Sequence, residues 1–151
     1  MLFLCDGNLF RSPYAAAALR GKFETTRTSS IYVASAGFMA PGQPTPNYAA
    51  RLARSRGVDL SSHISRLVTR ERIKAAHLIV LMSAARARGI RSSFAASTRL
   101  LVLGDLDPLP ITSRTIADPS RRDQRFPEQV YSRIDRCVEV LGDLVTPSAR
   151  V

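Results

Sequence analysis

The first thirteen residues contain a pair of side chains that could perform phosphate chemistry. Cys5 follows a short apolar run, residues 2–4, and Arg11 comes six positions later. A cysteine thiolate is a strong nucleophile. A guanidinium binds two phosphate oxygens in a planar fork that lysine cannot reproduce. If the segment between them closes around a phosphate group, the cysteine is the candidate nucleophile and the arginine the candidate anion clamp.

The residues between the cysteine and the arginine run from a predicted strand end to a predicted helix start at Pro13. Such a junction can turn successive backbone N–H groups inward, and the helix adds its unpaired N–H groups and its dipole. We expect Gly7 to adopt a positive φ there. We also expect Asp6 to point to solvent, because a carboxylate facing the sulfur would disfavour a thiolate. The predicted phosphate-binding residues are Asp6, Gly7, Asn8, Leu9, Phe10, Arg11 and Ser12.

The same electrostatic field favours a thiolate. A free cysteine titrates near pH ~8.5, whereas values of roughly 3.5–7.5 occur at helix N-termini beside cations. Ser12 can donate a hydrogen bond to the sulfur. A lone cysteine is more often an inert buried thiol, and a bare Cys-x5-Arg pattern is a weak signal. The strand, the Gly-Asn pair, the Arg-Ser-Pro run and the helix together make it a specific one.

Removal of a phosphate leaves an alkoxide or phenolate that needs a proton, and a carboxylic acid can supply it. Asp118 precedes a proline, which biases it toward an extended, projecting conformation. Asp105 and Asp107 also flank a turn, and Asp107 precedes a proline too. Spacing alone does not separate these three candidates.

The elements around these residues alternate between strand and helix. Four continuous apolar runs, residues 2–5, 31–36, 78–82 and 99–103, are typical of parallel strands buried on both faces. Helices are expected over residues 13–23, 47–56 and 83–91 and from about Pro127. The last helix carries an apolar stripe of Val130, Ile134, Cys137, Leu141 and Leu144, which assigns Cys137 to the core. The predicted fold is α/β, a small doubly wound four-stranded parallel sheet with helices on both faces.

Length and composition exclude several other classes of protein. The 151 residues, 45% hydrophobic and 23% charged, fit a single globular domain, residues 1–145, with a frayed tail at 146–151. No apolar run is long enough for a membrane span or an export signal, so we expect a cytoplasmic protein. No cysteine and histidine cluster has metal-ligand spacing, so no metal or cofactor is expected. The net charge of +10 attracts anions, yet no basic run with interleaved aromatics predicts nucleic-acid binding.

The loop resembles that of the low-molecular-weight protein tyrosine phosphatase family, which reads Cys-x-Gly-Asn-x-Cys-Arg-Ser-Pro. Further matches are Ser35-Ala36-Gly37, residues 57–66, residues 76–82 and Asp118-Pro119. The resemblance implies a flavodoxin-like fold and a phosphatase that works through a phosphocysteine intermediate, with Asp118 as the acid. It implies a phosphorylated protein or a small phosphate monoester as partner, and a monomer or weak dimer. It also implies that four residues brace the loop: Asn8, Ser12, Ser35 and His63.

The sequence departs from this family in two places. Phe10 replaces the usual second cysteine of the loop, and Ser120 replaces the usual aromatic residue after Asp-Pro. Phe38 is therefore expected to provide a wall of the substrate slot. Two alternatives stay open, namely arsenate reduction with an external thiol partner, and a phosphate-binding regulatory module without turnover.

Overall fold

The computed structural model describes residues 1–28, 30–39, 41–94, 99–119 and 126–146. Its centre is a parallel sheet in the order β2-β1-β3-β4, which confirms the predicted fold class. The strands are short, and most of their residues are buried. They span Leu2–Cys5 (β1), Ala34–Gly37 (β2), Ile79–Leu81 (β3) and Leu100–Val102 (β4).

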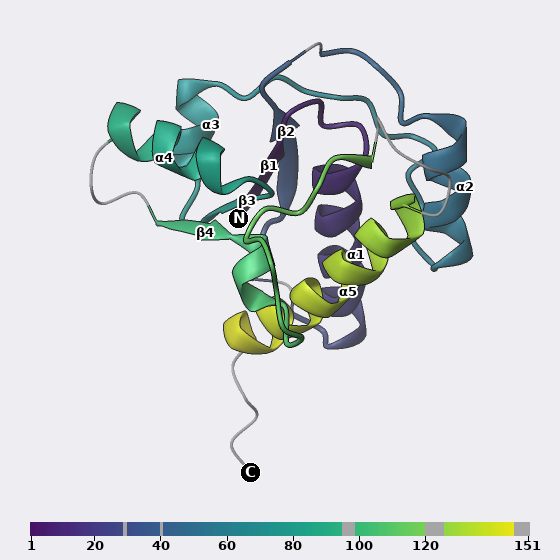
Figure 1. Ribbon diagram of the computed structural model, residues 1–151. Helices are drawn as coiled ribbons and strands as arrows, with labels where there is room; N and C mark the ends of the chain where they lie inside the picture. Colours follow the sequence, from purple (N-terminus) through teal and green to yellow (C-terminus); the bar gives the residue numbers. More distant parts are fainter. Residues whose placement is uncertain (29, 40, 95–98, 120–125, 147–151) are drawn as a thin grey trace.

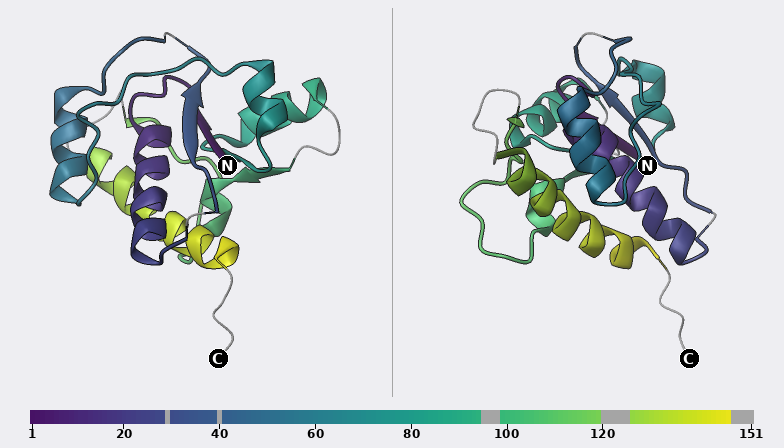
Figure 2. Two further views of the ribbon diagram at one scale, coloured as in Figure 1. Left: turned by 180° about the vertical axis from the view of Figure 1, so that it is seen from behind. Right: turned by 90° about the vertical axis from the view of Figure 1, so that its right-hand side faces the viewer.

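Helices cover both faces of this sheet (Figures 1 and 2). Phe3 and Cys5 of β1 point toward the core shared with α1 and α5, whereas Leu2 and Leu4 point toward α3 and α4. This two-sided burial explains why β1 is apolar throughout and does not alternate. The helices are α1 (Arg11–Thr25), α2 (Asn47–Ser55), α3 (Arg70–Ala75), α4 (Ala84–Ser93) and α5 (Phe126–Val145), with a 3-10 turn, η1 (Leu103–Leu106).

The strand order places β1 at the point where the chain connections diverge. One crossover leads through α1 to β2 on one side of β1, and β3 lies on the other side. In open α/β sheets of this kind, ligands bind outside the carboxyl ends of the strands at such a switch point. Cys5 is the last residue of β1 and pairs in register with Gly37 of β2. The predicted nucleophile therefore lies where this fold binds ligands.

Several boundaries differ from the sequence-based expectations. β2 begins at Ala34 and not at Ile31, and α1 begins at Arg11 and not at Pro13. α3 was not predicted; Thr69 caps it by accepting a hydrogen bond from the Arg72 amide. Leu144 is 68% exposed, so the apolar stripe of α5 ends before it. Of the predicted tail, only Thr146 lies within the described residues. Among the described residues, no helix is long and apolar enough to cross a membrane.

Candidate active site

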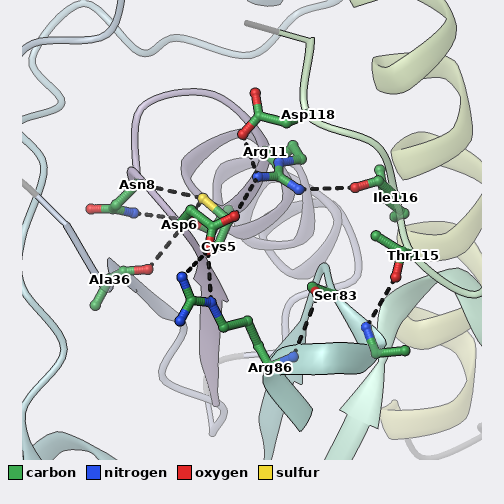
Figure 3. Close-up of polar contacts among 12 residues, drawn as sticks. Cys5, Asp6, Asn8, Arg11, Ala36, Ser83, Arg86, Thr115, Ile116 and Asp118 are labelled. Atoms are coloured by element: carbon green, nitrogen blue, oxygen red, sulfur yellow. Dashed lines mark hydrogen bonds and ion pairs between the residues drawn. The ribbon is translucent and has the colours of Figure 1, made fainter. Parts of the chain in front are cut away.

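The sulfur of Cys5 lies at the bottom of a tight loop between β1 and α1 (Figure 3). Its Sγ is 2.9 Å from the Ser12 hydroxyl and accepts a hydrogen bond from the backbone N–H of Asn8 at 3.2 Å. Cys5 is 5% exposed, and Asn8 and Ser12 are completely buried. The Ser12 hydroxyl and the Asn8 backbone N–H therefore hold the sulfur inside the loop.

Asn8, and not Gly7, adopts the left-handed backbone conformation in this loop, with φ of 52°. The expectation for Gly7 was wrong, because Asn is the side chain that best tolerates this region and can hydrogen-bond locally. The side-chain Nδ2 of Asn8 donates to Ser12 Oγ and to Ser35 Oγ, both at 2.9 Å. The side-chain Oδ1 of Asn8 accepts a hydrogen bond from the backbone N–H of Arg66 at 2.9 Å. The side chain thus joins α1, β2 and the segment before α3.

His63 and Gly37 hold the outside of the same loop. The His63 Nε2 lies 2.8 Å from the Asn8 carbonyl oxygen, and burial lowers the pKa of this imidazole. A neutral ring with its proton on Nε2 donates to that carbonyl. A Cβ at position 37 would lie 2.7 Å from the Asp6 carbonyl oxygen and 2.8 Å from the Asn8 nitrogen. Only glycine permits the loop to approach β2 this closely.

The Arg11 side chain is buried, with 3% exposed, and bridges the loop to a distant segment. Its Nη1 donates to the Ile116 carbonyl at 2.9 Å, and its Nη2 donates to Asp118 Oδ2 at 2.5 Å. Asp118 is 43% exposed and lines the same cavity as Cys5. The structure therefore brings the predicted nucleophile, anion clamp and acid together around one opening.

The two other candidate acids lie elsewhere. Asp105 forms an ion pair with Arg114 at 2.6 Å, and hydrogen bonds from this arginine lower the pKa of Asp105. Asp107 is buried between two arginines of α5, Arg133 and Arg136, and hydrogen bonding to Arg136 lowers its pKa. These contacts give both carboxylates structural partners away from the cavity. Of the three candidate acids, only Asp118 lines the cavity that contains Cys5.

Asp6 does not simply point to solvent, which corrects the expectation for this residue. One carboxylate oxygen accepts from Arg86 Nε at 2.8 Å and lies 2.7 Å from Arg86 Nη2, and the other lies 3.5 Å from Arg11 Nη2. Sequence reasoning missed Arg86, because nothing in its neighbours along the chain pairs it with position 6. Figure 3 shows Asp6 between the two guanidinium groups.

The opening above Cys5 is a cavity of about 490 Å³. Its wall includes Leu9, Met39 and Tyr48 together with the loop and Asp118. Phe38 is not part of this wall, contrary to expectation; its ring lies under the Arg86 guanidinium, 4.6 Å from its centre. Ser120 lies outside the described residues.

Phe10, which replaces the family's second cysteine, belongs to an aromatic stack. Its ring is 4.3 Å from that of Tyr131, and Tyr131 stacks on Tyr14 at 3.6 Å. The substitution therefore joins the loop to α5 by packing. The remaining cysteine, Cys137, is buried in α5, and burial raises the pKa of its thiol to about 11, which suits a core role.

Among the described residues, no group of three or more His, Cys, Asp or Glu side chains could hold a metal ion. The cavity brings together a thiol, a guanidinium and a carboxylate, from Cys5, Arg11 and Asp118. Together they define a cysteine-dependent phosphate site built on a strand–loop–helix junction.

Comparison with known proteins places the whole chain in one family. The family model for low molecular weight phosphotyrosine protein phosphatase matches residues 1–147. A probable low molecular weight protein-tyrosine-phosphatase, EpsP, from Ralstonia nicotianae is 31% identical over 141 residues, which are 92% of this chain and 90% of that protein. The low molecular weight protein-tyrosine-phosphatase Ptp from Acinetobacter johnsonii is 29% identical over 91% of this chain and 92% of its own length.

Solved structures agree on the fold. The tyrosine phosphatase AmsI of Erwinia amylovora superposes with a TM-score of 0.82 at 23% identity, covering 97% of this chain and 92% of its own. The Drosophila arginine phosphatase superposes with a TM-score of 0.86 at 20% identity, covering 97% of this chain and 98% of its own. The chain belongs to the low molecular weight phosphotyrosine protein phosphatase family. It is a phosphatase whose family works through a phosphocysteine intermediate.

Proposed function

We propose that this protein removes phosphate from phosphotyrosine in proteins, with Cys5 as nucleophile, Arg11 as phosphate clamp and Asp118 as general acid and base. The observation that carries this assignment is the position of Arg11. Its buried guanidinium lies in the loop around Cys5 and donates to Asp118 at 2.5 Å, across 107 positions of sequence. One side chain thus links the proposed acid to the loop that holds the proposed nucleophile, which supports this assignment.

In the first step, the Cys5 thiolate attacks phosphorus, an S–P bond forms, and the bond to the leaving oxygen breaks. The phosphate oxygens occupy the backbone N–H groups of the loop and the Arg11 fork. A bound phosphate replaces the Asp118 carboxylate on Arg11. The negative charges beside Asp118 then favour its protonated form, which donates its proton to the departing oxygen.

In the second step, a water molecule attacks phosphorus and the S–P bond breaks. Asp118, now a carboxylate, accepts the proton of that water, and inorganic phosphate leaves. The Ser12 hydroxyl, 2.9 Å from Cys5 Sγ, stabilises the sulfur as it regains its negative charge. Neither step requires a metal ion or a cofactor.

The wall of the cavity favours an aromatic substrate. Leu9 and Met39 provide apolar surface, and Tyr48 adds a ring that is 44% exposed. Burial and the negative charge of Asp118 raise the pKa of Tyr48, so this phenol stays neutral and can pack against a ring. The two sequence relatives reported above, EpsP and Ptp, are named as protein-tyrosine-phosphatases, which supports the same choice.

Hydrolysis of an aryl phosphate by the wild-type protein and two cysteine variants tests the proposal. Cys5→Ser should abolish turnover and still bind phosphate, because serine keeps the shape without the thiolate. Cys137→Ala removes the other thiol, from the core, and should retain wild-type kcat per folded molecule. Substantial turnover by Cys5→Ser would refute the nucleophile assignment.

A substrate profile tests the narrower choice of phosphotyrosine. The rate with a phosphotyrosine peptide should exceed the rates with phosphoserine and phosphoarginine peptides of the same sequence. Incubation of the protein with arsenate and an external thiol, followed by measurement of arsenite, tests the alternative of arsenate reduction, which the family match does not favour.

We further propose a cytoplasmic protein, a monomer or weak dimer, without a nucleic-acid or membrane partner; light scattering of the pure protein checks the oligomeric state.

A further inference from the structure

The phosphate loop contains a carboxylate next to the nucleophile, and the fold supplies a cation for it. Asp6 follows Cys5 directly, and one of its oxygens lies 3.5 Å from Arg11 Nη2. An unopposed negative charge there disfavours a thiolate and competes with phosphate for Arg11. The other oxygen is held by Arg86 of α4 through two nitrogens, at 2.8 and 2.7 Å.

Arg86 is positioned by contacts that do not come from its own helix. It lies in the first turn of α4, three residues after the N-cap Ser83. A cation is unfavourable at that end of a helix, because the dipole there is positive. The Arg86 guanidinium instead lies over the Phe38 ring at 4.6 Å and reaches Asp6. Cation–π and ion-pair contacts therefore offset an unfavourable local position.

The same junction fixes both partners of Arg86. The Asp6 carbonyl oxygen accepts hydrogen bonds from the amides of Phe38 at 2.8 Å and Met39 at 3.0 Å. The backbone that carries the carboxylate is thus tied to the backbone that carries the ring. Arg86 reaches this junction from α4, and Figure 3 shows its guanidinium directed at Asp6.

We propose that Arg86 is a positioning residue that holds one oxygen of the Asp6 carboxylate, so that the other oxygen stays 3.5 Å from Arg11 Nη2, the Arg11 fork stays available to phosphate, and the negative charge beside Cys5 is opposed. This inference rests on the phosphatase function proposed above. Without Arg86, the Asp6 carboxylate moves from this 3.5 Å contact into a close ion pair with Arg11 and occupies a donor that the phosphate needs. Other titratable or charged groups also surround Cys5 from the packed elements, and the variants below keep all of them: Arg11, Tyr48, His63 and Asp118.

A double-mutant cycle tests the proposal with two measurements that need no turnover. The first is the affinity for inorganic phosphate by calorimetry. The second is the pH dependence of Cys5 alkylation by iodoacetamide, followed by mass spectrometry of the Cys5 peptide so that Cys137 does not contribute. The proteins are the wild type, Arg86→Ala, Asp6→Asn and the double variant. Arg88→Ala removes the same charge from an exposed position on the same helix and is the matched control.

Arg86→Ala should weaken phosphate binding about tenfold and move the alkylation profile to higher pH by about one unit. Asp6→Asn should restore both properties in the Arg86→Ala background, because no carboxylate remains to be neutralised. Arg88→Ala should behave as the wild type. Arg86→Lys should restore part of the loss, since lysine supplies the charge without the two-nitrogen contact.

Three results would overturn the proposal. Wild-type phosphate affinity and alkylation in Arg86→Ala would mean that Asp6 needs no partner. A loss that Asp6→Asn fails to restore would mean that Arg86 acts on the anion directly. A wild-type protein that binds no phosphate would overturn this inference and the proposed function together, whereas the first two results leave the proposed function intact.

Discussion

The phosphate loop, residues 5–12, and the acid segment, residues 116–119, face the same cavity but are held in different ways. The loop is organised around Asn8, which is completely buried and whose side chain and backbone reach Ser12, Ser35, His63 and Arg66. The acid segment is anchored by backbone contacts of Ile116 to Met82 and to Arg11, while the Asp118 side chain is 43% exposed.

This difference matches the tasks that we propose for the two regions. An anion site is effective when its donors are in place before the phosphate arrives, because no reorganisation is then needed. An acid that must leave Arg11, donate a proton and later accept one needs room to move. The anion site, which should stay rigid, is therefore buried around Asn8, and the side chain of the proposed acid, Asp118, is exposed. Arg11 belongs to both regions, so its replacement is expected to have the largest effect.

Arg11→Lys should lower kcat/KM for an aryl phosphate by roughly 10³-fold, since a point charge replaces both the phosphate fork and the tether to Asp118. Steady-state kinetics measures the loss. Arg20→Lys, an exposed position on the same helix, is the control and should retain activity. If Arg11→Lys kept near-normal kcat/KM, Arg11 would be a structural residue, and the two regions would not be linked through it.

Asp118→Asn should slow hydrolysis of phosphotyrosine by roughly 10²–10³, because the phenolate leaves without a proton. A substrate with a leaving group that needs no proton should be affected much less in the first step. Phosphocysteine should then accumulate and be detectable by mass spectrometry after an acid quench.

Asp105→Asn and Asp107→Asn are the controls for that experiment. Both remove a carboxylate whose contacts are with Arg114, Arg133 and Arg136. Neither should show a dependence on the leaving group or a trapped intermediate, once the rates are expressed per folded molecule. If Asp107→Asn trapped the intermediate and Asp118→Asn did not, the assignment of Asp118 as the acid would be wrong. The assignment of Cys5 as the nucleophile would be unaffected.

Asn8→Ala tests the rigid region. It removes three side-chain hydrogen bonds and puts a less suitable residue at a φ of 52°, so the free energy of unfolding should fall by about 2–3 kcal/mol. Urea denaturation measures this change. Asn47→Ala, at the exposed start of α2, should change stability by much less. Equal effects of the two substitutions would mean that the loop is not organised around Asn8.

His63→Gln is expected to have the smallest effect, visible in the pH dependence of stability. Burial lowers the pKa of His63 in the folded protein, so the unfolded chain binds its proton first as the pH falls. The stability contribution is complete above about pH 6.5 and decreases below it. His63→Gln should reduce the loss of Tm between pH 7.5 and 5, whereas the exposed His77→Gln should not. An unchanged slope in His63→Gln would exclude this contribution.

Much of the fold and of the rigid region was predictable from the sequence. Continuous apolar runs identify strands that are buried on both faces, because a two-sided sheet leaves no polar face to alternate. The strand, the loop and the helix around Cys5 lie within one short segment, so local rules suffice to predict a strand–loop–helix junction there. Only the resemblance to a known family, and no local rule, led to the expectation that Ser35 and His63 contact Asn8 as they do in the structure.

Other features depended on tertiary structure. The pairing of Asp6 with Arg86 spans 80 positions and that of Arg11 with Asp118 spans 107, and no periodicity along the chain encodes which of several charged residues will meet. The choice of Asn8 over Gly7 for the left-handed conformation arose because the Asn8 side chain finds three partners there. Residue types in a short motif therefore predict the chemistry that we propose for this protein, whereas packing determines which carboxylate lines the cavity with Cys5 and which cation pairs with Asp6.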